Sequence, residues 1–414
     1  MNKQVAIVVG LVAGLVLGLT AASTGSPTLM SIAEGVAPLG QAFVNLVRMV
    51  VIPLVAATIF TGVAGLGDPR RLGKLGGTTL LFFFGTTFIA IVIGLITMKT
   101  ALVIAPITVP SLPQGETAQE LPTALDFFLG LIPSNPFEIA ASGALLPLVV
   151  FMVLFGAAAG ALPEQHRAPL MSLAEAVTAT LVKLVHWILW TAPVGVFALA
   201  AAMTAASGWD LLKSLAVFVI AVTIALSIFV AVVYMPAAVF IGRLAPRQFI
   251  KGCIEPVVIA AGATSSAAAL PAMLDSGQTH LGVSRAVAGL VYSLGAAIGR
   301  AGSALFQGTA VIFLAALYDV PLSLPAIVSI IFATFFVSLT VAGVPSASLV
   351  TLAPALDVAG IPFAGVGMLF GIDRIPDMLR TAVNVTGHMT TSVVVQKIAA
   401  AEEKLPAPSD GRKF

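Results

Sequence analysis

Charged residues are scarce in this chain: only 9% of its 414 residues are Asp, Glu, Lys or Arg, and 59% are hydrophobic. Soluble domains carry about 25% charged residues, so a soluble protein with an unusually apolar core is a poor explanation. Apolar runs of about 20 residues, long enough to cross a bilayer, recur along the whole sequence. The composition therefore predicts an all-α polytopic membrane protein.

Cysteine and histidine are also rare. The single cysteine, Cys253, excludes an intramolecular disulfide framework and a thiolate cluster. The four histidines lie at positions 166, 186, 280 and 388, without the spacing of metal ligands. We therefore expect neither a metal site nor a cofactor.

The distribution of basic residues predicts the topology. We expect helices over 4–22, 36–66, 72–103, 143–162, 168–206 and 210–243. Lys and Arg fall between the second and third helices, between the fourth and fifth, and after the sixth, whereas residues 100–166 contain none. The positive-inside rule then places both termini in the cytoplasm and the loop before residue 143 outside the cell (inner) membrane. The first apolar run also resembles a signal peptide, but the many spans that follow favour an uncleaved helix.

Two later stretches are apolar but are interrupted near the middle by small residues, hydroxyls and proline. They read GCIEPVVIAAGATSSAAALPAMLDSG (252–277) and PLSLPAIVSIIFATFFVSLTVAGVPSASLVTLAPALDVAG (321–360). A break at mid-depth leaves backbone groups unpaired, which is tolerated only inside protein or beside a watery cavity. Two such segments in corresponding halves favour an inverted-repeat transporter with its binding site at the tips. Ordinary spans kinked at proline are the alternative.

The segment GIDRIPDMLRTAVNVTGHMTT (371–391) gathers polar side chains in an otherwise apolar chain. Asp373, Asp377, Arg380, Asn384 and His388 follow steps of four, three, four and four, so a helix projects all five from one face. Each charge at the centre of a lipid-facing helix costs roughly 2.5–3.5 kcal/mol. The face must therefore look inward, onto a structural salt bridge or onto a substrate.

The residue types on this face suit an acidic amino acid. Arg380, with Thr381 and Asn384 beside it, can hold a carboxylate through two parallel hydrogen bonds. Asp377 can accept hydrogen bonds from an ammonium group. Together with amide and hydroxyl donors for a second carboxylate, these groups favour a substrate with two carboxylates and an amine.

Arg300 lies between small residues in another apolar segment, LGAAIGRAGSALFQGTAVIF (294–313). It too needs an anionic partner or an aqueous pocket, and we expect Asp373, Asp377 or a bound anion. Glycines at positions 295, 299 and 302 permit close helix approach or an unwound turn around it.

Four motifs carry a resemblance to a known family. They are NPFEIAASGALLPLVVFMVLFGAA (135–158), SSAAALP (265–271), AGVPSASL (342–349) and DMLRTAVNVTGH (377–388). On these motifs the chain resembles the dicarboxylate/amino acid:cation symporter family, the glutamate transporter homologues, along nearly its full length. The resemblance implies eight transmembrane helices, two re-entrant helical hairpins, inverted repeats and an elevator mechanism. It also implies a homotrimer in the lipid bilayer that takes a small anionic substrate, and no nucleic-acid partner.

The resemblance further implies a division of the chain. Residues 1–71 and 143–206 would form scaffold helices 1–2 and 4–5. The other segments would be transport-domain helix 3 with the extracellular loop (72–142), helix 6 of that domain (207–249), re-entrant hairpin 1 (250–281), helix 7 (282–319), re-entrant hairpin 2 as the gate (320–358), helix 8 (359–399) and a cytoplasmic tail (400–414).

Roles at the substrate site follow from the same resemblance, position by position. The implied ligands are Asp377 for the amine, Arg380 for the side-chain carboxylate, Asn384 and Ser266 for the main-chain carboxylate, Thr381 and Ser303 as pocket walls that orient Arg380, and Ser265 with the backbone of Val344 at the two hairpin tips.

Two departures from the family pattern concern the coupling ion. The family usually has Asn-Met-Asp-Gly-Thr on the seventh helix, where this chain has GRAGS (299–303), and a sodium-binding Asp on the eighth, where it has His388. Two carboxylates are lost and one cation is gained, a shift of about three charges that has the sign of bound sodium. We hypothesise that Arg300 substitutes for a coupling cation, so that substrate binding is largely sodium-independent.

Other coupling schemes stay open. Thr86 and Thr87 match hydroxyls that help to bind sodium in the family, and Asp373 is a further candidate coupling group. A histidine titrates at about pH 6.5 when it is free in water, so His388 is either a proton carrier or a neutral, hydrogen-bonded core residue.

Functions of other classes are weaker explanations. An intramembrane hydrolase would use Ser265, Ser266 and His388, but no G-x-S-x-G motif accompanies them, so we expect no enzyme. An anion channel would explain the positive pathway and would give currents far above the turnover of a carrier. A receptor would be preferred only if Arg380→Ala and Asp377→Ala left uptake unchanged.

Overall fold

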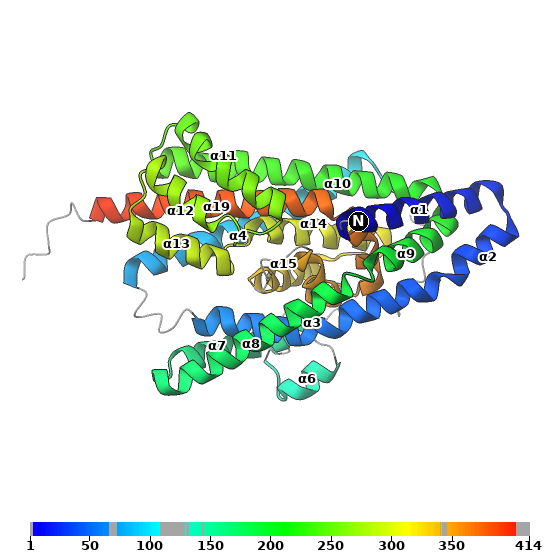
Figure 1. Cartoon of the computed structure of the whole chain (residues 1–414), viewed down its shortest axis with the longest axis horizontal. Helices are drawn as coiled ribbons and strands as arrows, with labels where there is room; N and C mark the ends of the chain where they lie inside the picture. The colour runs from blue at the N-terminus through cyan, green and yellow to red at the C-terminus, as the bar shows by residue number, and fades with distance from the viewer. Residues whose placement is uncertain are drawn as a thin grey trace, which may run out of the picture.

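The computed structural model describes residues 3–65, 73–107, 129, 132–142, 145–339, 341 and 346–402. Within these ranges every regular element is a helix, and most helices run roughly along the long axis of the molecule (Figure 1). The all-helical prediction is therefore confirmed for the described part of the chain.

The first half of the chain forms long apolar helices. Their bounds are α1 (Lys3–Thr24), α2 (Pro27–Gly35), α3 (Ala37–Gly65), α4 (Gly73–Ile104), α6 (Pro136–Ser142), α7 (Leu145–Gly160), α8 (Glu164–Ile188), α9 (Ala192–Ser207) and α10 (Trp209–Phe229), which two π-helical turns, η1 (Val230–Tyr234) and η2 (Ala237–Ile241), extend. Among the described residues, six segments are long and apolar enough to cross a membrane: Val5–Thr24, Pro27–Gly65, Leu75–Ile104, Glu164–Ile188, Trp209–Ile241 and Arg285–Leu317.

One predicted helix is wrong. The sequence was expected to form a single helix over 168–206, but α8 ends at Ile188 and α9 begins at Ala192. Pro193 lies in the first turn of α9. Backbone N–H groups in a first turn have no acceptor within the helix, so a proline costs no hydrogen bond there, whereas inside a continuous helix it would remove one. Helix α2 was not predicted either, because its nine residues form a run too short to stand out among long apolar segments.

Close helix contacts depend on small residues. Helix α1 packs along α9 (Figure 1), and glycines at positions 10, 14 and 18 face it. A Cβ atom at these positions would lie only 2.2–2.6 Å from the carbonyl oxygens of Pro193, Phe197 and Ala201. Such small-residue stripes let helix backbones approach closely in a membrane.

The second half of the chain is more interrupted. Its helices are α11 (Pro246–Ala263), α12 (Leu270–Thr279), α13 (Arg285–Ile298), α14 (Ala301–Leu317), α15 (Leu324–Ser338), α16 (Ala347–Val350), α17 (Ala353–Val358), the 3-10 turn η3 (Phe363–Gly365), α18 (Val366–Ile372) and α19 (Arg374–Glu402). Both stretches predicted to be interrupted consist of separate helices, rather than single spans kinked at proline.

Helices α14 and α19 lie at the centre of the molecule. Helix α14 packs against α4, α10, α15 and α19, and α19 also packs against α11 and α13. Of the most apolar 18 residues in Arg285–Leu317, 94% are buried, against 11% in α8. Polar side chains on α14 and α19 are therefore shielded from both lipid and water by their neighbours.

Candidate functional site

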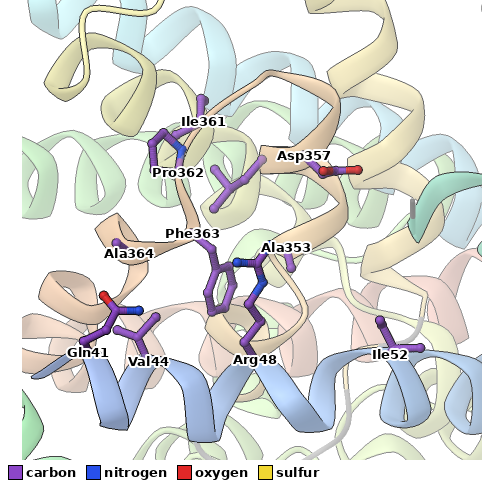
Figure 2. A pocket seen from close by; sticks show the side chains of 11 residues that line it. Gln41, Val44, Arg48, Ile52, Ala353, Asp357, Ile361, Pro362, Phe363 and Ala364 are labelled. Atoms are coloured by element: carbon purple, nitrogen blue, oxygen red, sulfur yellow. The ribbon is translucent and has the colours of Figure 1, made fainter. Parts of the chain in front are cut away.

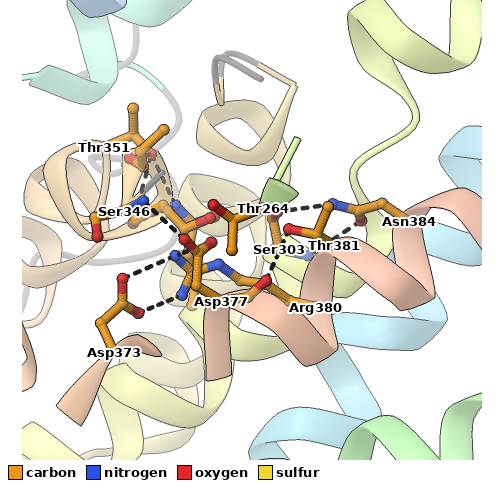
Figure 3. Close-up of polar contacts among 12 residues, drawn as sticks. Thr264, Ser303, Ser346, Thr351, Asp373, Asp377, Arg380, Thr381 and Asn384 are labelled. Carbon is orange, nitrogen blue, oxygen red and sulfur yellow. Dashed lines mark hydrogen bonds and ion pairs between the residues drawn. The ribbon is translucent and has the colours of Figure 1, made fainter. Parts of the chain in front are cut away.

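A small polar cavity lies between the α11–α12 loop, the α13–α14 break, the start of α16 and the N-terminal part of α19 (Figure 3). Its volume is about 10 Å³, roughly the space of one water molecule. Buried side chains line it: Thr264, Ser266, Arg300, Ser303, Val341, Ser348, Asp377, Arg380, Thr381 and Asn384. Seven predicted site residues thus come together, although they lie up to 118 positions apart in the sequence (266 to 384).

Of the residues predicted to bind substrate, one does not line the cavity and one lies outside the described residues, and three residues of the lining were not predicted. Ser265 is half-buried and does not line the cavity, and Val344 lies outside the described residues. The unpredicted residues are Thr264, Val341 and Ser348. Thr264 and Ser348 could have been predicted from the sequence, because both hydroxyls lie within the two interrupted stretches.

Arg380 is neutralised by two carboxylates (Figure 3). Its Nη1 and Nη2 donate to Asp373 Oδ1 and Oδ2 at 2.6 and 3.1 Å, and Nη2 lies 2.8 Å from Asp377 Oδ1. The guanidinium also sits 4.4 Å from the centre of the Phe306 ring. Asp373 ends α18 and Asp377 is three residues before Arg380 on α19, so the predicted polar face becomes a buried charge cluster. This fork-shaped pairing is the strong geometry for arginine and carboxylate.

The other carboxylate oxygen of Asp377 is hydrogen-bonded to the start of α16. Oδ2 accepts a hydrogen bond from the backbone N–H of Ser346 at 3.1 Å, and Ser346 has a left-handed φ of 59°. Gln307 on α14 adds two bonds to the same region, from Nε2 to Ser348 O at 3.1 Å and to Thr351 Oγ1 at 3.0 Å. A cavity of about 10 Å³ is too small to hold an organic acid.

Asn384 shapes the beginning of α14. Its Oδ1 accepts from the backbone N–H groups of Gly302 and Ser303 at 2.8 and 3.3 Å, and its Nδ2 donates to Ser303 Oγ at 3.1 Å. These bonds satisfy N–H groups that a helix start leaves unpaired. A Cβ atom on Gly302 would lie 2.5 Å from Arg380 O, so the predicted close approach at the glycine cluster is confirmed.

Arg300 occupies the break between α13 and α14, but the two carboxylates predicted as possible partners, Asp373 and Asp377, do not contact it. Its Nη1 donates to Ser266 Oγ and its Nη2 to Ala296 O, both at 2.6 Å. Asp373 and Asp377 pair with Arg380 instead, and the ion pairs of the described residues include none to Arg300. Its Nε has no partner in the described part of the chain. A buried charge without a counter-charge is costly.

His388 does not line the cavity but contacts Gly299, the residue before Arg300. It is fully buried, its Nε2 is 2.8 Å from Gly299 O, and its ring meets Phe83 edge-on at 5.9 Å. A carbonyl only accepts, so Nε2 carries the proton of this bond. Gly295 and Gly299 make room, since a Cβ on either would come within 2.8 Å of the imidazole. The arrangement matches the hydrogen-bonded core histidine.

The two hydroxyls considered for a residual sodium site, Thr86 and Thr87, have different surroundings. Thr86 Oγ1 donates to Phe82 O of its own helix at 2.8 Å, and Thr87 Oγ1 is buried without a partner among the described residues. Among the described residues, no group of three or more His, Cys, Asp or Glu side chains could hold a metal ion.

A larger cavity, of about 260 Å³, lies between α3 and the segment from α17 to η3 (Figure 2). Arg48 of α3 points across it toward Phe363, and Asp357 lies on the opposite wall. The cavity shares no residue with the polar site, and its remaining lining is mostly apolar: Gln41, Val44, Ile52, Ala353, Leu356, Ile361, Pro362 and Ala364. Its size alone does not make it the substrate site.

Comparison with known proteins agrees with the sequence motifs. The profile of the sodium:dicarboxylate symporter family matches residues 4–398. The chain is 31% identical to a proton/glutamate-aspartate symporter of Escherichia coli, over 87% of this chain and 84% of the relative. It is 32% identical to a proton/sodium-glutamate symport protein of Bacillus caldotenax (88% and 88%) and 28% identical to a C4-dicarboxylate transport protein of Bacillus subtilis (88% and 88%). The chain therefore belongs to the sodium:dicarboxylate symporter family and is a multi-pass membrane transporter, not an enzyme.

Proposed function

We propose that the chain is a secondary transporter that moves acidic amino acids, aspartate or glutamate, or related C4-dicarboxylates across the cell (inner) membrane. The named relatives carry such substrates. The observation that carries the proposal is the buried cavity, which is lined by two arginines, one aspartate, five hydroxyl side chains and one amide.

The charges of the cavity support a substrate with both an amine and carboxylates. Asp377 already accepts from Arg380 and Ser346, so a substrate ammonium can replace these donors without leaving the carboxylate unpaired. That exchange frees one side of Arg380 for the side-chain carboxylate of the substrate, while Asp373 keeps holding the other side. Thr381, whose hydroxyl donates to Asp377 O, lines the same wall.

For ion coupling, we propose that Arg300 stands in for a coupling cation and that transport does not require sodium. The guanidinium of Arg300 is only 4% exposed and has no carboxylate partner among the described residues, which supports this role. Proton coupling through His388 and a residual sodium site at Thr86 and Thr87 are the alternatives. The hydrogen bond of His388 Nε2 to Gly299 O favours a structural role for the histidine.

Movement would follow the predicted division of the chain. Segment 320–358 would be the gate, because Ser346 and Ser348 within it close the cavity. Helices within 1–71 and 143–206 would form the static scaffold and the contacts of a homotrimer, which the low burial of α8 supports. Both termini would lie in the cytoplasm, and the remaining helices would travel together as an elevator.

Counterflow in proteoliposomes tests the proposal. Vesicles loaded with unlabelled L-aspartate are expected to accumulate labelled L-aspartate at the same rate in sodium and in choline medium. Arg380→Ala should abolish the uptake, whereas Lys213→Ala, which removes an exposed ion pair with Asp210, should leave it unchanged. Uptake only with sodium would remove the substitute-cation role, and large currents without accumulation would indicate an anion channel instead.

A further inference from the structure

One end of the polar cavity offers hydrogen-bond donors and no carboxylate. Both acids of the site, Asp373 and Asp377, are bound to Arg380. Four other lining residues, Arg300, Ser266, Ser303 and Asn384, make up the second end. The two ends therefore differ in what they can bind, and a charged group at the second end must be an anion.

The hydrogen bonds of this end fix the direction of its hydroxyls. Ser266 Oγ accepts from Arg300 Nη1 at 2.6 Å, so its own proton is available to donate elsewhere. Ser303 Oγ accepts from Asn384 Nδ2 at 3.1 Å, so its hydroxyl proton is likewise available to donate. Asn384 keeps its second amide proton, because Oδ1 is held by two backbone N–H groups. Each of these groups lines the cavity and can donate into it.

Arg300 adds the charge to this donor set. Its Nη1 and Nη2 bonds hold the guanidinium against Ser266 and Ala296, and Nε, buried without a partner in the described residues, remains to donate. The start of α14, with its positive end of the helix dipole, lies directly after Arg300. A carboxylate bound here would supply the missing counter-charge and accept from donors that are already oriented.

We propose that Arg300 is a direct ligand of the main-chain carboxylate of the substrate, and not only a cation that acts at a distance. The inference rests on the proposed function, since it assumes an acidic amino acid as substrate. The main-chain carboxylate is assigned to this end because it lies next to the amine, which Asp377 would bind, whereas Arg380 is left for the side-chain carboxylate. Arg300 then determines specificity as well as charge.

Calorimetric titration with three ligands separates direct contact from a general field effect. The ligands are L-aspartate, its main-chain amide L-isoasparagine and its side-chain amide L-asparagine. A hydrogen bond to a charged group corresponds to about 10- to 150-fold in affinity. The affinity of the wild-type protein for isoasparagine should therefore be at least about 10-fold lower than its affinity for aspartate. In Arg300→Met the ratio between these two ligands should fall to within about threefold, while the ratio of asparagine to aspartate stays at its wild-type value.

Two further variants keep the test decisive. Arg300→Lys retains the charge without the planar fork and should also lose discrimination against isoasparagine. Arg374→Gln removes a nearby arginine that contacts Gly262 O and does not line the cavity, and it should leave every ratio unchanged. Equal weakening of all three ligands in Arg300→Met, or unchanged ratios in Arg300→Lys, would overturn the direct contact. Wild-type protein that binds none of the three ligands would instead overturn the proposed function itself.

Discussion

The surroundings of Arg380 and Arg300 form the clearest contrast in the molecule. The two residues line the same cavity and are 1% and 4% exposed. Arg380 is held by two carboxylates, whereas Arg300 is held by a hydroxyl and a backbone carbonyl. Both guanidiniums are buried, but within the described part of the chain only Arg380 has a carboxylate partner.

This contrast assigns the two arginines different parts in binding. The cluster of Arg380, Asp373 and Asp377 carries one positive and two negative charges, and each of these groups has a partner of opposite charge within the protein. Arg300 brings the four-residue sum to zero but touches neither acid. We propose that its partner is a substrate anion rather than a protein side chain.

Exchanging each arginine for methionine should have opposite effects on stability, and this is the largest expected difference. Arg380→Met leaves two buried carboxylates without a cation, which costs about 3–5 kcal/mol for a broken buried pair. Arg300→Met removes a buried cation that has no counter-charge, so stability should hold or increase. Thermal unfolding of ligand-free protein in detergent measures both. Equal destabilisation by the two variants would contradict the contrast.

Replacing Asp377 by asparagine should weaken binding of amine-bearing substrates selectively. The ammonium loses a charged acceptor, and we expect aspartate affinity to fall by about 10- to 150-fold. Succinate, which has no amine, should be affected much less, and Arg380 should stay paired with Asp373. Asp210→Asn, at an exposed acid, is the matched control. A parallel loss for both ligands would remove the assignment of Asp377 to the amine.

A glutamine at position 388 should have the smallest effect. Its amide can donate to Gly299 O as the imidazole Nε2 does, so folding and the charge of the site are preserved. We expect counterflow rates within about twofold of wild type from pH 5 to 8, because neutral histidine and glutamine share the donor that the structure uses. A pH profile that flattens only in His388→Gln would instead favour proton coupling.

The sequence predicted the polar face of α19 because helical spacing and the cost of buried charge are local properties. It also located the breaks on either side of the site, where glycine, proline and hydroxyls interrupt apolar runs. It did not predict that both acids pair with Arg380, because the position of Arg300 depends on the packing of α14 against the α11–α12 loop. Contacts of Ser346 and Gln307 were missed for the same reason.

Calorimetry of L-aspartate binding to purified protein, in sodium and in choline buffer of equal ionic strength, tests the central claim most directly. If Arg300 is the resident cation of the site, the two affinities will agree within about threefold, a difference of less than one kcal/mol. An affinity that is tenfold or more higher in sodium would contradict the account, because the site would then still need an external cation beside Arg300.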